Sequence, residues 1–235
     1  MKKYYIISLV IFLFFINEGC YSQIPGFMGK RALVQFNLRV SPALLNPAPP
    51  LSFTGDLGIV NVLKSFQLEY VLTRKLSAGL SYNTYNSKVD WVGRISETDN
   101  MSLRGDVTGA SYGINLKIYG QNVAPLGSYI MTEFLYMPYT FTKANNSYSS
   151  SDMIAVNENG YTTYGLVFQM GNQRIFFNRI VTNFGVSFGY VFKTLSNIIS
   201  DDNLTNDNAT FIISNNRLLG MSIFNLNLGI GLLIF

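Results

Sequence analysis

The chain has 235 residues, of which 48% are hydrophobic and 13% charged, with a formal net charge of +4. A mean hydropathy of +0.21 is unusual for a water-soluble domain, and the small basic surplus does not indicate a nucleic-acid partner. Histidine is absent and Cys20 is the one cysteine, which excludes the usual general base of hydrolases and an intramolecular disulfide.

The N-terminal segment is typical of an export signal. Lys2 and Lys3 precede an apolar run over residues 4–16, which is too short to span about 30 Å of hydrocarbon as a helix. The small residues Cys20 and Ser22 suit cleavage after Ser22, so we predict a signal peptide at 1–22 and a mature domain at 23–235. The alternative is that Cys20 is a lipidated lipoprotein cysteine.

From residue 33 onward, apolar and polar residues alternate, and the apolar ones have even numbers. This period of two residues is typical of strands with one apolar face. Most segments are close in length to a tilted membrane strand, which needs about 9 to 11 residues. The fifth segment is the least regular, because Met131, Leu135 and Met137 interrupt its polar face. The eight predicted strands are residues 33–40, 65–72, 76–85, 108–119, 129–141, 161–170, 179–192 and 218–235.

The connectors between these segments alternate in length. Loops near 20 residues count against a compact soluble domain, whereas long extracellular loops and short periplasmic turns are typical of outer-membrane barrels. Backbone N–H and C=O groups in hydrocarbon must all be hydrogen-bonded, so the sheet must close into a barrel without free edges. We therefore predict an all-β, transmembrane, antiparallel up-and-down β-barrel of eight strands. The long connectors are residues 41–64, 86–107, 142–160 and 193–217, and the short ones are 73–75, 120–128 and 171–178.

Two further patterns support this orientation. Aromatic residues on the apolar face lie near the long loops, where they are expected to form an interfacial girdle. Basic residues gather at the predicted periplasmic rim, which suits anionic headgroups and makes outer-membrane lipid the expected partner. The predicted girdle is Phe66, Tyr82, Tyr112, Tyr136, Tyr164 and Tyr190, and the predicted rim is Lys30, Arg31, Arg74, Lys75, Arg174 and Arg179.

The odd-numbered, inward face is polar and rich in glycine. Its four charges are Arg39, Glu69, Lys117 and Glu133, two of each sign. Charges away from water persist when paired, so we predict a neutralised interior network. The alternative is a proton relay or a narrow selectivity site. A diffusion pore is disfavoured, because eight strands leave room only for side chains.

One acid-rich segment is a candidate calcium site. Asp201, Asp202 and Asp207 offer the hard oxygen ligands that Ca²⁺ prefers, but the segment lacks the EF-hand spacing. A solvated loop is the favoured interpretation, and no cofactor is expected.

The export signal, the eight alternating segments, the connector pattern and the terminal Phe235 together resemble the small OmpA/OmpX-type outer-membrane barrels. The resemblance covers about residues 29–235 and implies that Phe235 is part of the signal for the barrel-insertion machinery. One departure is that Phe235 shares parity with the inward Asn225 and Asn227. Either a bulge near residues 229–231 shifts the register, or Phe235 lies beyond the barrel edge.

A fold of this kind does not by itself define a function. The favoured hypothesis is a non-enzymatic protein whose long loops serve binding, adhesion or envelope protection. The alternative is an accessory subunit of a larger envelope assembly, such as a secretion or motility complex, with an unknown protein partner. An enzyme acting on lipid or peptide is less favoured, since it would need Ser or an acid pair such as Glu69 and Glu133.

Overall fold

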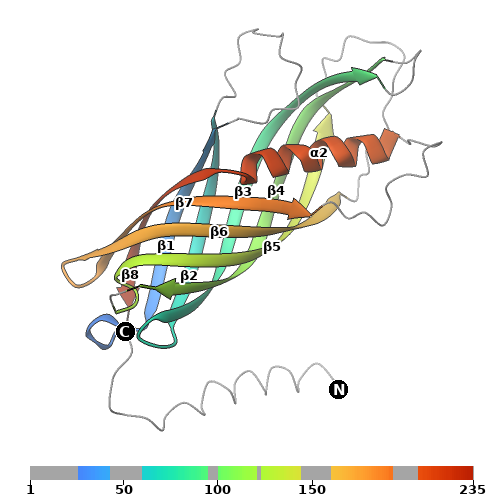
Figure 1. Ribbon diagram of the computed structural model, residues 1–235. Helices are drawn as coiled ribbons and strands as arrows, with labels where there is room; N and C mark the ends of the chain where they lie inside the picture. Colours follow the sequence, from blue (N-terminus) through green and yellow to red (C-terminus); the bar gives the residue numbers. More distant parts are fainter. Residues whose placement is uncertain are drawn as a thin grey trace, which may run out of the picture.

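The computed structural model describes residues 26–42, 60–94, 100–120, 123–143, 160–192 and 206–234. Within these ranges no α-helix is both long and apolar enough to cross a membrane. The elements are η1 (Phe27–Gly29), β1 (Ala32–Pro42), β2 (Val60–Val71), β3 (Leu76–Arg94), β4 (Asn100–Tyr119), β5 (Gly127–Lys143), β6 (Tyr161–Phe176), β7 (Ile180–Phe192), α2 (Asn206–Ser222) and β8 (Asn225–Ile234) (Figure 1).

The eight strands form one closed barrel in which every strand pairs with its neighbours in the chain. All pairs are antiparallel, and the pairing of β1 with β8, for example Val34 with Leu232, closes the cylinder. The turns between β2 and β3, β4 and β5, and β6 and β7 lie together at one end (Figure 1). The prediction of a closed, eight-stranded, up-and-down barrel is confirmed.

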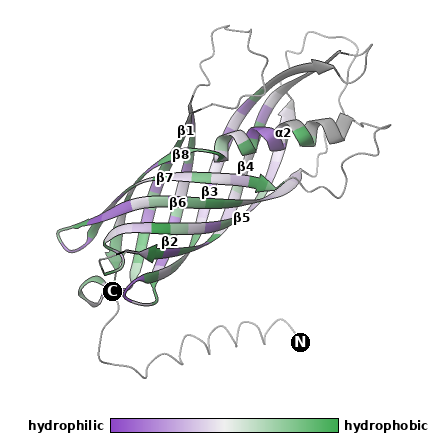
Figure 2. Ribbon diagram, viewed as in Figure 1, coloured by the Kyte–Doolittle hydropathy of each residue, from purple (hydrophilic) through white to green (hydrophobic). Residues whose placement is uncertain are grey.

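The wall is apolar outside and mainly polar inside over most of its height. Side chains alternate between the two faces of a strand, so the even-numbered Ile114 is 68% exposed while its neighbour Asn115 is 2% exposed. Green and purple segments accordingly alternate along the strands in Figure 2. The large side chains exposed on the outward face of this band are Leu, Ile, Val, Phe, Tyr and Met, which suits contact with hydrocarbon.

This pattern reverses at the end of the barrel opposite the turns, which we call the mouth. There Tyr85, Val89 and Val107 point inward and are buried, while Asn86 and Lys88 point outward and are exposed. The apolar face therefore moves from the even to the odd positions, as in a water-soluble barrel.

The reversal explains why the predicted loop at 86–107 is wrong. β3 continues to Arg94 and β4 begins at Asn100, and the two pair as far as these residues. A search for apolar even-numbered residues could not detect this extension. β2 and β6 are also longer than predicted, so the connector 171–178 contracts to a tight turn in which Phe177 and Asn178 have positive φ angles of 52° and 59°.

The predicted strand at 218–235 is wrong in its first part. Residues up to Ser222 belong to α2, and β8 begins only at Asn225. The predicted long loop at 193–217 therefore contains most of a helix. β8 pairs without interruption with β1, so the bulge considered near residues 229–231 is absent from the described strand. Phe235 lies outside the described residues, and so do residues 1–25, which include the predicted signal peptide and Cys20.

Candidate functional site in the barrel interior

The first interior ion pair joins opposite sides of the barrel. Arg39 on β1 donates from Nη2 to Oε2 of Glu133 on β5 across 2.7 Å, and the two side chains are 7% and 0% exposed. Ser81 donates its hydroxyl to the other carboxylate oxygen, Oε1. Gly113 leaves room for these groups, since a Cβ there would lie 2.7 Å from Glu133 Oε1.

The second ion pair lies closer to the turns. Lys117 Nζ is 2.5 Å from Glu69 Oε2, and these side chains are 1% and 0% exposed. Ser77 Oγ and the Tyr119 hydroxyl each lie 2.6 Å from Glu69 Oε1. Lys117 also lies over the ring of Tyr129, 4.5 Å from its centroid, in cation–π geometry. The structure thus brings the four interior charges together as two pairs, each with additional hydroxyl donors.

Apolar clusters lie on both sides of this charged layer. Near the turns, Leu33, Val181 and Leu233 are buried together, and Phe27 of η1 packs against them. Toward the mouth, a larger cluster includes Leu135, Met137, Tyr139 and Phe141 of β5, and also Leu218 and Met221 of α2. Two of the residues that interrupt the polar face of β5, Leu135 and Met137, therefore belong to the cluster that includes helix residues, whereas the third, Met131, is buried nearer the turns with Tyr119 and Tyr129.

Helix α2 lies across the mouth half of the barrel (Figure 1). It contacts β7, β3, β1 and β6. Because β3 and β7 are separated by three strands in either direction around the closed sheet, contact with both requires the helix to cross the lumen. The pairing of β7 with β8 ends at Ser187 and Asn225, and the helix C-terminus lies near this point. A Cβ on Gly189 would be 2.8 Å from the Ser222 carbonyl oxygen, so glycine permits the close approach.

Arg217 attaches the helix to the opposite wall. Its Nε donates to Ser87 Oγ at 2.7 Å, and its Nη2 donates to Asn61 Oδ1 at 3.0 Å. Burial lowers the pKa of the Arg217 guanidinium below its ordinary value. Arg217 is not among the predicted site residues, because it is the last residue of the predicted loop at 193–217. A run of residues without Gly or Pro from Asn206 to Leu219 is the signal that favours a helix there.

The predicted girdle residues all lie on the outer wall. Their exposure ranges from 41% to 54%. Five of them follow one another in register across β2 to β6, and the rings of Tyr82 and Tyr112 are 5.5 Å apart. Polar residues such as Lys64 and Thr84 come next toward the mouth, so the row marks one boundary of the apolar band. The predicted girdle residues are Phe66, Tyr82, Tyr112, Tyr136, Tyr164 and Tyr190.

The three acids weighed as a candidate calcium site do not form a described cluster. Asp201 and Asp202 lie outside the described residues, and Asp207 is placed near the start of α2. Among the residues that the structure describes, no group of three or more His, Cys, Asp or Glu side chains could hold a metal ion.

Most of the predicted rim residues lie in or beside the turns. Lys30 Nζ donates to the carbonyl of Asn178 in the β6–β7 turn at 3.0 Å, and the carbonyl of Arg74 accepts from Ala124 N–H at 2.8 Å. These contacts hold neighbouring turns together. Arg174 differs, because it lies on the outward face of β6 rather than in a turn.

An apolar outer band, a closed ladder and an interior of paired charges together define the class of this protein, a transmembrane β-barrel. No protein-family model matches the chain, and no curated protein matches it. Three solved structures are similar to it at 10–12% identity and TM-scores of 0.40–0.45. At this level of similarity they say nothing about the activity of the chain.

The three structures are bacterial surface barrels. The N-terminal β-barrel domain of Pseudomonas aeruginosa OprF has a TM-score of 0.40 at 11% identity, covering 86% of this chain and 97% of that one. Neisserial surface protein A has a TM-score of 0.45 at 10% identity, with coverage of 86% and 97%. The outer membrane protein OprG from Pseudomonas aeruginosa has a TM-score of 0.44 at 12% identity, with coverage of 87% and 93%.

Proposed function

We propose that the chain is a non-enzymatic protein of the bacterial outer membrane, in which a plugged barrel supports the long segments that connect strands at its mouth. These segments serve binding, adhesion or envelope protection. Connecting segments on a rigid scaffold are where binding residues are most often found.

The observation that carries this proposal is the obstruction of the lumen. Two buried ion pairs occupy its middle, η1 packs near the turns, and α2 crosses the mouth half. A barrel filled in this way does not leave an aqueous path for solutes.

The chemistry of the two interior acids also supports a non-enzymatic role. Glu69 and Glu133 each form an ion pair with a neighbouring cation and are 0% exposed as side chains. An acid-pair mechanism requires carboxylates within reach of a substrate. Neither group meets this requirement.

Two measurements test the proposal. In planar bilayers, the purified protein is expected to give no steady conductance, and a stable open channel would refute the plugged interior. In cells, the three longer connecting segments 43–59, 144–159 and 193–205 are replaced by short Gly-Ser linkers, with the inserted barrel verified by its heat-modifiable gel mobility. Loss of surface binding or increased envelope stress is expected, and wild-type behaviour would refute the proposed role.

Purification in mild detergent distinguishes this proposal from its main alternative, an accessory subunit of a larger envelope assembly. The proposal expects the barrel to be recovered without a stoichiometric partner. A partner that copurifies at fixed ratio, and whose loss reproduces the phenotype, would instead indicate an accessory subunit of an envelope assembly.

A further inference from the structure

An arginine on the outer wall is the one charged residue on three consecutive strands. β6, β7 and β8 contain Arg174 and no other Lys, Arg, Asp or Glu. Arg174 has an even number, and its side chain is exposed on the outward face. Among the described residues no side chain forms an ion pair with it.

Apolar residues lie on both sides of Arg174 along the wall. Toward the turn, Phe176 is 46% exposed and Phe177 is 89% exposed. Toward the barrel centre, Phe184 and Leu228 are 58% and 51% exposed. A guanidinium at the edge of an apolar band is costly unless an anion or water solvates it, because its charge is poorly solvated by hydrocarbon.

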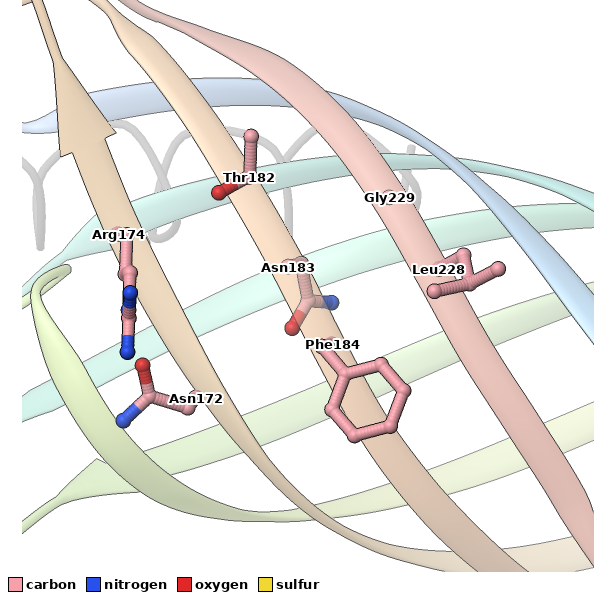
Figure 3. A pocket seen from close by; sticks show the side chains of 7 residues that line it. All are labelled: Asn172, Arg174, Thr182, Asn183, Phe184, Leu228 and Gly229. Carbon is pink, nitrogen blue, oxygen red and sulfur yellow. The ribbon is translucent and has the colours of Figure 1, made fainter.

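A groove of about 390 Å³ surrounds this position on β6, β7 and β8 (Figure 3). Arg174 lies directly across from Thr182 in the ladder, and Asn172 lies across from Phe184. In Figure 3 the carbonyl oxygen of Asn172 faces the Arg174 guanidinium, and Phe184 and Leu228 lie farther along the same wall. Asn172 Nδ2 donates to Ser128 Oγ at 3.1 Å, so the donors at this end of the groove are Arg174 and the Thr182 hydroxyl. The groove therefore has hydrogen-bond donors at one end and apolar side chains at the other.

The charge around the groove favours an anion. Arg179 and Lys30 lie at the adjoining turn, where Lys30 Nζ binds the Asn178 carbonyl. Glu69 and Glu133 are buried inside the lumen and paired, and Asp106 lies on β4 at the mouth, the end of the barrel away from the groove. Arginine presents a planar fork of donors that matches the oxygens of a phosphate.

We propose that this groove binds the phosphate of a phospholipid in the leaflet at the turn end, through Arg174 and Thr182. The acyl chains lie along Phe184 and Leu228. The inference rests on the membrane location proposed above, and in that orientation the leaflet is the periplasmic one. The proposed groove is a specific lipid site on the wall, whereas the basic residues at the turn end as a group would attract any anionic surface.

The test uses native mass spectrometry of the full mature chain with two lipids. Phosphatidylglycerol carries the phosphate, and diacylglycerol with the same acyl chains does not. The wild-type protein is expected to retain one phosphatidylglycerol at least about tenfold more strongly than diacylglycerol. The binding free energy of a hydrogen bond to a charged group corresponds to a change in affinity of about this size. Equal retention of the two lipids would overturn the proposal.

Two substitutions in the groove are compared with a matched control. Arg174→Gln is expected to lower the retention of phosphatidylglycerol at least about tenfold, and Thr182→Val about two- to fivefold. Lys75→Gln removes the same charge at the same end but outside the groove, and is expected to bind as the wild type does. Retention by Arg174→Gln equal to that of the wild type, or an equal loss in Lys75→Gln, would overturn the proposal.

The same preparations separate this inference from the proposed function. If the wild-type protein fails to insert into vesicles, the membrane location is wrong and the lipid site with it. If all variants insert and show the heat-modifiable mobility of a folded barrel, but substitution of Arg174 does not change lipid retention, only the lipid site is wrong. Capture of a periplasmic protein through Arg174 without any lipid retention also counts against the lipid site.

Discussion

Replacing Glu133 with methionine is expected to destabilise the barrel strongly, because the change leaves Arg39 buried without its counterion. The Arg39 side chain is 7% exposed, and its Nη2 lies 2.7 Å from Glu133 Oε2. Removing one partner of a buried pair typically costs about 3–5 kcal/mol. The same range is expected for Arg39→Met, which leaves the carboxylate with the Ser81 hydroxyl as its remaining donor.

The double variant Arg39→Met/Glu133→Met separates pairing from burial. Replacing both charges with apolar side chains of similar volume is often neutral or stabilising, since neither ion then has to be desolvated. We therefore expect the double variant to be more stable than either single one, with a coupling energy of at least about 2 kcal/mol.

The assay is equilibrium urea unfolding of the protein in phospholipid vesicles, followed by tyrosine fluorescence and by heat-modifiable gel mobility. Lys64→Gln, which removes an exposed outward charge, is the control and is expected to change stability by less than about 0.5 kcal/mol. If each single substitution costs under about 1 kcal/mol, or if the double variant costs the sum of the two, the pair does not lie in a low-dielectric interior as argued.

Three further predictions concern the wall, the packing and the helix. Leu116→Arg places a charge in the outward apolar band and is expected to lower the free energy of unfolding in vesicles by about 2–4 kcal/mol. Asn86→Arg, on the outward face near the mouth, is expected to leave stability nearly unchanged, and equal costs for the two variants would contradict the assigned band. Gly113→Ala is expected to cost about 1–3 kcal/mol in the same unfolding assay, because the new methyl group would lie 2.7 Å from Glu133 Oε1, and an unchanged midpoint would contradict this packing. Arg217→Met removes the bonds to Ser87 and Asn61, so hydrogen–deuterium exchange of α2 is expected to increase while β5 stays protected; unchanged exchange would show that Arg217 does not hold the helix.

The strand order, and which side chains of the membrane band point outward, could be predicted from the sequence because both depend on local alternation. A two-residue period specifies which side chains share a face, and short turns between successive segments specify antiparallel neighbours. From this period, the girdle residues could be predicted on the outward face and the four charges of the strands on the inward face. The prediction failed between residues 86 and 107, because the environment outside the wall changes from lipid to water and the apolar face changes with it.

The sequence by itself determined that this chain has eight strands, an apolar outer face and, on the inward faces of the strands, two charges of each sign. Only the tertiary structure decided that Arg39 pairs with Glu133, 94 residues away, and Lys117 with Glu69, because these partners meet through the register of a closed cylinder. It also decided that residues 206–222 form a helix, since a segment with weak amphipathicity becomes helical here by packing Leu218 and Met221 onto the apolar mouth of the barrel.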